Sequence, residues 1–255
     1  MARIIAFANQ KGGVGKTTSA VNIAAALGFL GQRVLMCDCD PQGNATSGMG
    51  INRRELRLST YEVLVGLCSA REAVVHTEYK NLDALPSSMK LAGAEFELVD
   101  ADKRELRLKT ALSELYDDYD YIVCDCPPSL GILTINTLVA AEGVVIPMQC
   151  EYYSLEGLSQ LTMTIKQIKQ RWNSRLEITG ILLTMYNARL NLTAEVVKEL
   201  KKYYSAKLFK SPIPRSVRLS EAPSFGEPIV YFDRWSKGSV AYLDNAKELI
   251  ERTKV

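Results

Sequence analysis

A long apolar run is missing from this sequence. No uncharged apolar stretch approaches the ~20 residues that a helix needs to span a bilayer. A secretory signal is missing too, because Lys11 and Lys16 interrupt the N-terminus before an apolar core could follow a basic start. We therefore expect a cytoplasmic protein that has no membrane partner.

An excess of charge of one sign is also missing. The chain has 31 Lys and Arg against 29 Asp and Glu, a formal net charge of +2. Net charge alone therefore predicts neither a nucleic-acid partner nor a membrane partner. The distribution of the basic residues has to decide that question.

Linkers, charge blocks and internal repeats that could mark a second domain are absent as well. Apolar runs typical of buried strands instead alternate with helical patterns along the chain. This alternation predicts a single domain over residues 1–255, an α/β fold with a doubly wound, mostly parallel sheet flanked by helices. The main expected strands cover residues 4–8, 33–38, 82–86, 119–125, 143–149 and 178–184, and the main expected helices residues 17–30, 154–172, 193–203 and 239–252.

The six cysteines lack the setting of a disulfide framework, because no signal peptide precedes them. Two pairs have strand spacing, Cys37 with Cys39 and Cys124 with Cys126. Side chains at i and i+2 of a strand share one face, so two small buried hydrophobic residues explain each pair. A metal or iron–sulfur site is the alternative interpretation.

A glycine-rich loop follows the first expected strand. Residues 9–18 read Asn-Gln-Lys-Gly-Gly-Val-Gly-Lys-Thr-Thr and lead into an apolar helix. Glycines let backbone N–H groups turn inward, and a helix N-terminus adds partial positive charge, so this loop can hold phosphates. Lys16 would reach the β- and γ-phosphates, and the Thr17 hydroxyl would bind Mg²⁺. A glycine-rich turn that binds nothing rarely has this order of strand, glycines, Lys-Thr and helix.

The loop resembles the deviant Walker A signature, K-G-G-x-G-K-[ST], of the ParA/MinD/nitrogenase-iron-protein class of P-loop ATPases. Gln10 stands where the usual motif has glycine, and a second lysine, Lys11, begins the loop. The resemblance implies ATP and Mg²⁺ as cofactors, and Lys11 as a residue that crosses a dimer interface to the partner's phosphates. The expected nucleotide-binding residues of the loop are Lys11, Gly12, Gly13, Val14, Gly15, Lys16, Thr17 and Thr18.

Asp40 follows the second main strand. In an open α/β sheet, ligands bind at the carboxyl ends of the strands, so Asp40 can face the γ-phosphate and orient the attacking water or hold a water ligand of Mg²⁺. An Asp before Pro41 is also a common turn former. We favour the functional interpretation because Asp-Pro-Gln-Gly-Asn-Ala-Thr at residues 40–46 resembles switch I of ParA-type partitioning ATPases.

Asp125 ends another buried strand, where a Walker B carboxylate would hold Mg²⁺ through water. Pro127 and Pro128 stiffen the loop that follows. Asp-x-Pro-Pro is similar to switch II of the same family, so the loop is expected to move as a unit with the state of the nucleotide. A rigid connector is the alternative.

Basic residues gather near the C-terminal third of the chain. Glu199 is the only acid between Lys198 and Arg218, a stretch with seven basic residues: Lys198, Lys201, Lys202, Lys207, Lys210, Arg215 and Arg218. Such clustering suits contact with the phosphate backbone of nucleic acid, independent of base sequence.

Residues 212–223 resemble the C-terminal segment of Soj-like ParA proteins. The resemblance implies that Asn187 and Pro214 lie near the adenine. It also implies that the DNA-binding residues are Arg189, Arg215 and Arg218, with Lys198, Lys201 and Lys202 as auxiliary contacts.

The resemblance covers nearly the whole chain and implies an ATP-dependent dimerisation switch. Such a homodimer binds double-stranded DNA non-specifically, and a ParB-type centromere-binding protein stimulates its ATP hydrolysis in chromosome or plasmid partitioning. We expect a nucleoid-associated location. The alternatives are a MinD-like membrane-associated positioning ATPase, disfavoured because no amphipathic tail follows the last expected helix, and an iron protein or ATP-dependent synthetase.

Overall fold

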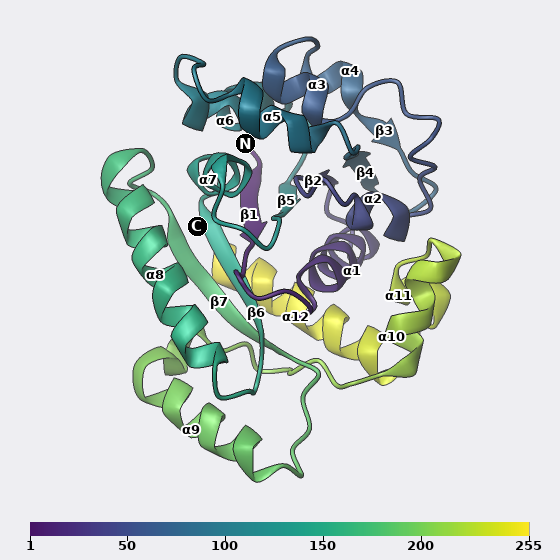
Figure 1. The fold of residues 1–255 in the computed structure, drawn as a ribbon. Helices are drawn as coiled ribbons and strands as arrows, with labels where there is room; N and C mark the ends of the chain where they lie inside the picture. The colour runs from purple at the N-terminus through teal and green to yellow at the C-terminus, as the bar shows by residue number, and fades with distance from the viewer. Residues whose placement is uncertain (255) are drawn as a thin grey trace.

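A seven-stranded sheet forms the centre of the computed structural model, which describes residues 1–254 (Figure 1). The strand order is β3-β4-β2-β5-β1-β6-β7, and every neighbouring pair is parallel except β3 with β4. The doubly wound, mostly parallel sheet expected from the sequence is therefore confirmed. The strands are β1 Arg3–Phe7, β2 Val34–Asp38, β3 Val75–His76, β4 Leu82–Leu85, β5 Tyr121–Asp125, β6 Gly143–Gln149 and β7 Glu177–Thr184.

Helices cover both faces of this sheet (Figure 1). They are α1 Lys16–Phe29, α2 Asn44–Gly48, α3 Thr60–Val65, α4 Ala70–Ala73, α5 Leu91–Glu97, α6 Arg107–Leu112, α7 Ile132–Ala140, α8 Ser154–Arg171, α9 Asn191–Tyr204, α10 Val217–Glu221, α11 Ile229–Phe232 and α12 Lys237–Thr253. Four short 3₁₀ turns, η1 Arg104–Leu106, η2 Ser113–Leu115, η3 Ser205–Lys207 and η4 Ala222–Phe225, adjoin them.

The core is split into two halves by the sheet, because successive strand residues point to opposite faces. In β1, Ile4 and Ala6 pack with residues of α3, α5, α6, α7 and α8, whereas Ile5 and Phe7 pack with α1 and α12. Helix α1 is buried almost all round, between the sheet and α12, which explains why its apolar residues are not confined to one stripe.

The strand register brings three chain segments to one edge of the sheet. Phe7, Asp38 and Asp125, the last residues of β1, β2 and β5, lie side by side in register. The pairing continues one residue further, since Cys39 N–H donates to the Asp125 carbonyl at 3.0 Å and Cys126 N–H to the Phe7 carbonyl at 3.2 Å. The loops that follow these strands therefore start next to one another.

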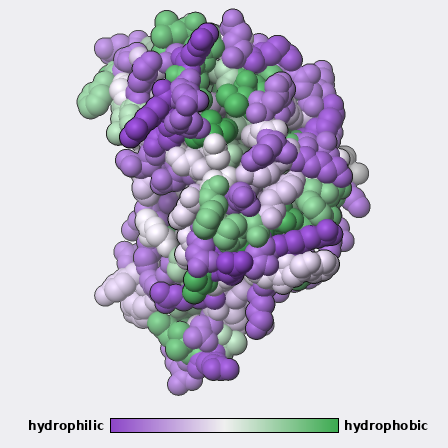
Figure 2. Space-filling view, turned by 90° about the vertical axis from the view of Figure 1, so that its right-hand side faces the viewer, coloured by the Kyte–Doolittle hydropathy of each residue, from purple (hydrophilic) through white to green (hydrophobic). Residues whose placement is uncertain are grey.

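Hydrophilic side chains separate small apolar patches on the side of the molecule that carries α10 and α11 (Figure 2). Within residues 1–254, no helix combines the length and the apolar character that a bilayer crossing requires.

Candidate nucleotide-binding site

The glycine-rich loop connects β1 to the first turn of α1, as the sequence predicts. Gly13 and Gly15 have φ of 71° and 80°, in the left-handed region that a side chain would strain. A Cβ placed on Gly12 or Gly13 would meet no heavy atom within 4 Å, so the space in front of the loop is open. The loop can therefore receive phosphates against its N–H groups and against the N-terminus of α1.

Three polar side chains hold this loop from behind. Asn9 Nδ2 donates to the Pro147 carbonyl, Gln149 Nε2 to the Gly13 carbonyl, and Thr184 Oγ1 to the Val14 carbonyl, each at 2.8 Å. The bonds from Gln149 and Thr184 occupy two carbonyl oxygens of the loop, and Asn9 ties the start of the loop to β6 while its Oδ1 accepts the Lys11 N–H at 3.0 Å. The sequence reasoning missed Gln149 and Thr184, although both end strands that it predicted.

Lys16 is buried at the start of α1, with 7% of its surface exposed. Its Nζ lies 3.4 Å from the carbonyl oxygen of Lys11, so the side chain folds back along the loop. Burial lowers the pKa of Lys16, and the carboxylate of Asp125 opposes this shift. An ammonium in this position needs a negatively charged partner, which a phosphate would supply.

Asp125 has the character of a metal-binding carboxylate. Both carboxyl oxygens are buried and have no hydrogen-bond partner among the described residues. Burial raises its pKa well above the usual range, the neighbouring Asp38 raises it further, and the Thr17 hydroxyl beside it opposes the rise. Unpaired buried oxygens next to a hydroxyl fit Mg²⁺, which binds through one or two protein oxygens together with phosphates and water.

Asp38 is a second buried carboxylate beside Asp125, and the sequence reasoning gave it no role. Its Oδ2 accepts bonds from Thr46 N–H at 2.8 Å and Thr46 Oγ1 at 2.6 Å, and its Oδ1 accepts one from Asp40 N–H at 3.1 Å. Burial raises the pKa of Asp38 to about 7, and the bonds from Thr46 oppose that rise. Asp38 thus fixes the start of the loop that carries Asp40.

Asp40 lies in a tight turn at the carboxyl end of β2, with 6% of its surface exposed. Its Oδ1 accepts a bond from Gln42 N–H at 2.9 Å, and its carbonyl accepts bonds from Gly43 N–H at 2.9 Å and Ser87 Oγ at 2.7 Å. Asp40 therefore does form a turn, and that turn places its carboxyl group at the edge that holds Lys16 and Asp125.

The expected adenine-binding residues reach the same edge. A parallel bridge joins Tyr186 to Pro214, with Tyr186 N–H donating to the Ile213 carbonyl at 2.9 Å, so Asn187 and Pro214 lie close together. Gln149, which holds the glycine-rich loop, also contacts Met185 Sδ at 3.1 Å. These contacts connect the expected base-binding segment to the expected phosphate-binding loop.

Lys11 lies at the surface next to the loop. Its ammonium forms an ion pair with Glu151, in the segment between β6 and α8. The Lys11 ammonium is therefore at the protein surface beside the site, where a second copy of the chain could be reached.

The three expected DNA-binding arginines, Arg189, Arg215 and Arg218, are all exposed. Arg218 is engaged within the chain, since its guanidinium bonds to Asp233 at 2.9 Å and Glu221 at 3.0 Å and lies 4.8 Å from the Phe232 ring centroid. Arg189 is three residues beyond Tyr186, and Arg215 directly follows Pro214, so the bridge between Tyr186 and Pro214 brings the segments of these two arginines together.

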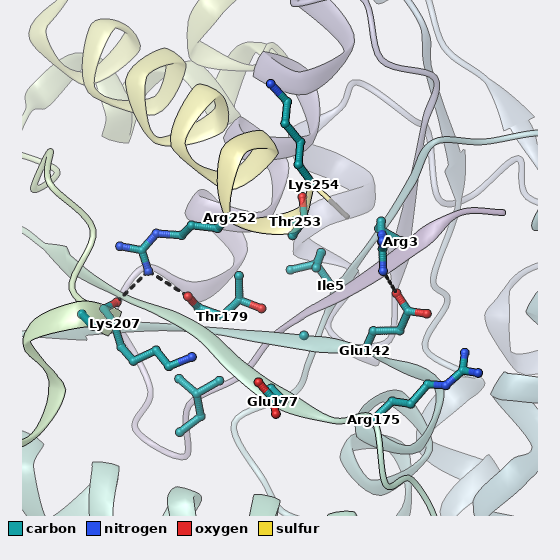
Figure 3. A pocket seen from close by; sticks show the side chains of 13 residues that line it. Arg3, Ile5, Glu142, Arg175, Glu177, Thr179, Lys207, Arg252, Thr253 and Lys254 are labelled. Carbon is teal, nitrogen blue, oxygen red and sulfur yellow. Dashed lines mark hydrogen bonds and ion pairs between the residues drawn. The ribbon is translucent and has the colours of Figure 1, made fainter.

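A cavity of about 540 Å³ lies at the opposite edge of the sheet, near the amino ends of β1, β6 and β7 (Figure 3). Two of its cations are engaged within the chain: Arg3 pairs with Glu142 at 3.1 Å, and Arg252 donates to the carbonyls of Thr179 and Lys207. Figure 3 shows Lys254 directed away from the centre. We assign no ligand to this cavity.

The paired cysteines pack inside the half of the core that contains α7. Cys37 Sγ lies 3.6 Å from Cys39 Sγ, and β2–β5 pairing places Cys37 beside Cys124. Among residues 1–254, no three His, Cys, Asp or Glu side chains are arranged to hold a metal ion on their own. All four side chains are buried, which agrees with the interpretation of each pair as two small hydrophobic residues.

A glycine-rich loop between the first strand and helix, with aspartates at the ends of adjacent parallel strands, defines a P-loop nucleotide-binding protein. Residues 2–178 match the family described as AAA domain. The chain is 53% identical to sporulation initiation inhibitor protein Soj of Bacillus subtilis over 98% of both chains. It is 51% identical to chromosome partitioning protein ParA of Myxococcus xanthus, over 98% of this chain and 88% of that one. The chain therefore belongs to the ParA/Soj family of P-loop ATPases.

A solved structure extends the comparison. Cobyrinic acid a,c-diamide synthase from Mycobacterium smegmatis, with bound ATP analogue and magnesium, is 38% identical, with a TM-score of 0.86 over 98% of this chain and 95% of that one. The Soj and ParA relatives are more similar to this chain in sequence than this synthase is. The comparisons therefore support a role in chromosome or plasmid partitioning.

Proposed function

We propose that this chain is a single-domain ATPase whose dimerisation is switched by ATP. The dimer binds double-stranded DNA without sequence preference and hydrolyses ATP when a ParB-type partner stimulates it, in the nucleoid of the cytoplasm. The observation that carries the nucleotide site is the unpaired, buried carboxyl group of Asp125 beside Thr17 and Lys16. The proposed dimerisation switch rests on the membership of the chain in the ParA/Soj family.

The residues divide the work of phosphoryl transfer. The backbone of residues 11–18 and the Lys16 ammonium bind the phosphates, and Asp40 lies on the attacking water or on a water ligand of the metal ion. Thr17 and Asp125 would hold Mg²⁺, which would offset the negative charge of the phosphates. Asn187 and Pro214 contact the adenine. In this arrangement the role of ATP hydrolysis is to return the dimer to monomers, and no other product is formed for use elsewhere.

Dimerisation tests the proposal most directly. We expect the protein to elute as a monomer with ADP and as a dimer with a slowly hydrolysed ATP analogue in size-exclusion chromatography. Lys11→Ala should bind the analogue yet stay monomeric, because the cation that crosses to the partner's phosphates is gone. Lys166→Ala, which removes an exposed lysine of α8, is the matched control and should dimerise. A Lys11→Ala protein that dimerises like the control contradicts the cross-interface role.

DNA binding is expected to depend on ATP because each chain offers few phosphate contacts. The exposed arginines and the lysines of α9, Lys198, Lys201 and Lys202, form a modest set of cations per chain. Joining two such sets in a dimer raises affinity through effective concentration. Binding should also weaken steeply as salt increases, since it rests on phosphate contacts.

We expect Arg218→Glu to preserve ATP binding and dimerisation and to abolish duplex binding, because it replaces a phosphate contact with a repelling charge. The reverse change is Asp233→Asn, which frees the Arg218 guanidinium from one of its two carboxylates and should tighten DNA binding. Fluorescence anisotropy with two unrelated duplexes at several salt concentrations measures both effects. Unchanged DNA affinity in the Arg218→Glu dimer, or equal DNA affinity with ADP and with ATP, would contradict the proposal. The basic residues would then form an ordinary solvated surface.

A further inference from the structure

Arg53, in the loop between α2 and α3, contacts the turn that carries Asp40. Arg53 Nη1 donates to the carbonyl oxygen of Gln42, and its Nη2 donates to the carbonyl oxygen of Pro41 at 3.1 Å. Neither bond is local, because Arg53 is 11 and 12 residues from its two acceptors. The guanidinium therefore links the loop after α2 to the turn before α2.

The contact between Arg53 and the turn is close. Gly43 has a φ of 61°, and a Cβ on it would lie 2.4 Å from Arg53 Nε and 2.5 Å from Arg53 Cζ. Arg53 Nε is buried there without a hydrogen-bond partner. The guanidinium thus lies against the bare backbone of Gly43, and its two terminal nitrogens make all of its hydrogen bonds in the described chain.

The two carbonyls that Arg53 binds belong to the two peptide groups that bind Asp40. The peptide that carries the Pro41 carbonyl also carries the Gln42 N–H, which donates to Asp40 Oδ1 at 2.9 Å. The next peptide carries the Gln42 carbonyl and the Gly43 N–H, which donates to the Asp40 carbonyl at 2.9 Å. Because a trans peptide is planar, fixing its oxygen fixes the direction of its N–H.

We propose that Arg53 is a positioning residue for ATP hydrolysis, which holds both peptide groups that orient Asp40. This inference rests on the proposed role of Asp40. Charge-assisted bonds to the two carbonyls also polarise the peptides, which strengthens the N–H bonds to Asp40. Arg53 acts through the turn and makes no contact with the reacting atoms.

A lysine at position 53 can replace only part of the hydrogen bonding between Arg53 and the Pro41 and Gln42 carbonyls. The planar guanidinium presents two donors in a fixed fork, whereas an ammonium is a single point donor on a flexible chain. Arg53→Lys should therefore hold one carbonyl at a time and give an intermediate rate, while Arg53→Ala should hold neither.

The experiment compares Arg53→Ala, Arg53→Lys and the control Arg54→Ala in the full chain, by single-turnover ATP hydrolysis and by affinity for a fluorescent ATP analogue. Arg54 is the exposed neighbour, and its side chain makes no hydrogen bond in the described chain. Loss of orientation at a catalytic group should lower the hydrolysis rate of Arg53→Ala by roughly 10- to 100-fold with little change in affinity. Hydrogen exchange at the Gln42 and Gly43 amides should become faster in the same variant.

Several outcomes overturn the inference. One is a hydrolysis rate for Arg53→Ala equal to that of Arg54→Ala; another is a fall in ATP affinity or melting temperature large enough to explain the rate, which would make Arg53 a general structural residue. The double variant with Asp40→Ala should be no slower than Asp40→Ala alone, and an additive loss would show that Arg53 acts elsewhere. If Asp40→Ala itself hydrolyses normally, the proposed function of Asp40 fails instead.

Discussion

A Lys16→Ala variant is expected to lose ATP binding and, with it, ATP-dependent dimerisation and DNA binding. Lys16 is a buried cation close to Asp125 and Asp40, so its removal leaves carboxylates facing the phosphates with nothing to offset the repulsion. Truncating one partner of a buried, hydrogen-bonded charge pair costs about 2–5 kcal/mol or more. In affinity this corresponds to a loss of about 30-fold to several thousand-fold.

Titration with a fluorescent ATP analogue measures this loss. Lys11→Ala is the matched control, because it removes a lysine from the same loop while leaving the buried ammonium in place. The control should bind the analogue, whereas Lys16→Ala should not. Affinity near that of the unmodified protein in Lys16→Ala would remove this lysine from the phosphate site.

The sheet could be predicted because its strands are apolar runs with clear ends. The strand over residues 143–149 was predicted with the bounds that β6 has, and the first strand and the strand over residues 178–184 were each displaced by one residue at one end or both. The strand expected at 119–125 begins only at Tyr121, since residues 119 and 120 precede the ladder with β1 and β2. Such errors at the ends are expected where burial, not pairing, defines the pattern.

The helices of residues 53–117 were the least predictable part of the fold. Helices α3 and α4 are only six and four residues long, so they show no full amphipathic period. A signal was present nevertheless, because Ser59 with Glu62 and Ser69 with Glu72 form capping boxes that start these helices.

Helix α7 was missed for another reason: it is buried on nearly all sides and has no polar stripe.

The residues of the candidate site also differ in how well they could be predicted, depending on whether they are close together in the sequence. Its motif residues could be found because each motif is contiguous in sequence and stands at the carboxyl end of an expected strand. The residues that hold them could not, since Gln149 and Gly13 are 136 residues apart, Thr184 and Val14 are 170 apart, and Ser87 and Asp40 are 47 apart. Contacts of this kind depend on the folded register and leave no local pattern in a single sequence.

An Asp40→Ala variant is expected to bind ATP with ordinary affinity, to hydrolyse it at least ~100-fold more slowly, and to accumulate as the dimer. The phosphate-binding loop does not depend on Asp40, and the two hydrogen bonds to the Asp40 carbonyl, from Gly43 N–H and Ser87 Oγ, remain in the variant. Only the carboxyl group and its bond to Gln42 N–H are removed. The state that precedes hydrolysis should therefore form and persist.

Single-turnover hydrolysis, read together with size-exclusion chromatography in ATP, tests this expectation, and Asp40→Asn separates the two roles of the side chain. An amide oxygen can still accept the bond from Gln42 N–H and so preserve the turn, but it carries no charge to orient or accept a proton from water. If Asp40 acts on the water, Asp40→Asn is as slow as Asp40→Ala and also accumulates as the dimer. A fast Asp40→Asn protein beside a slow Asp40→Ala protein would instead make Asp40 a turn former, and the group that activates the water would have to be sought elsewhere at this edge of the sheet.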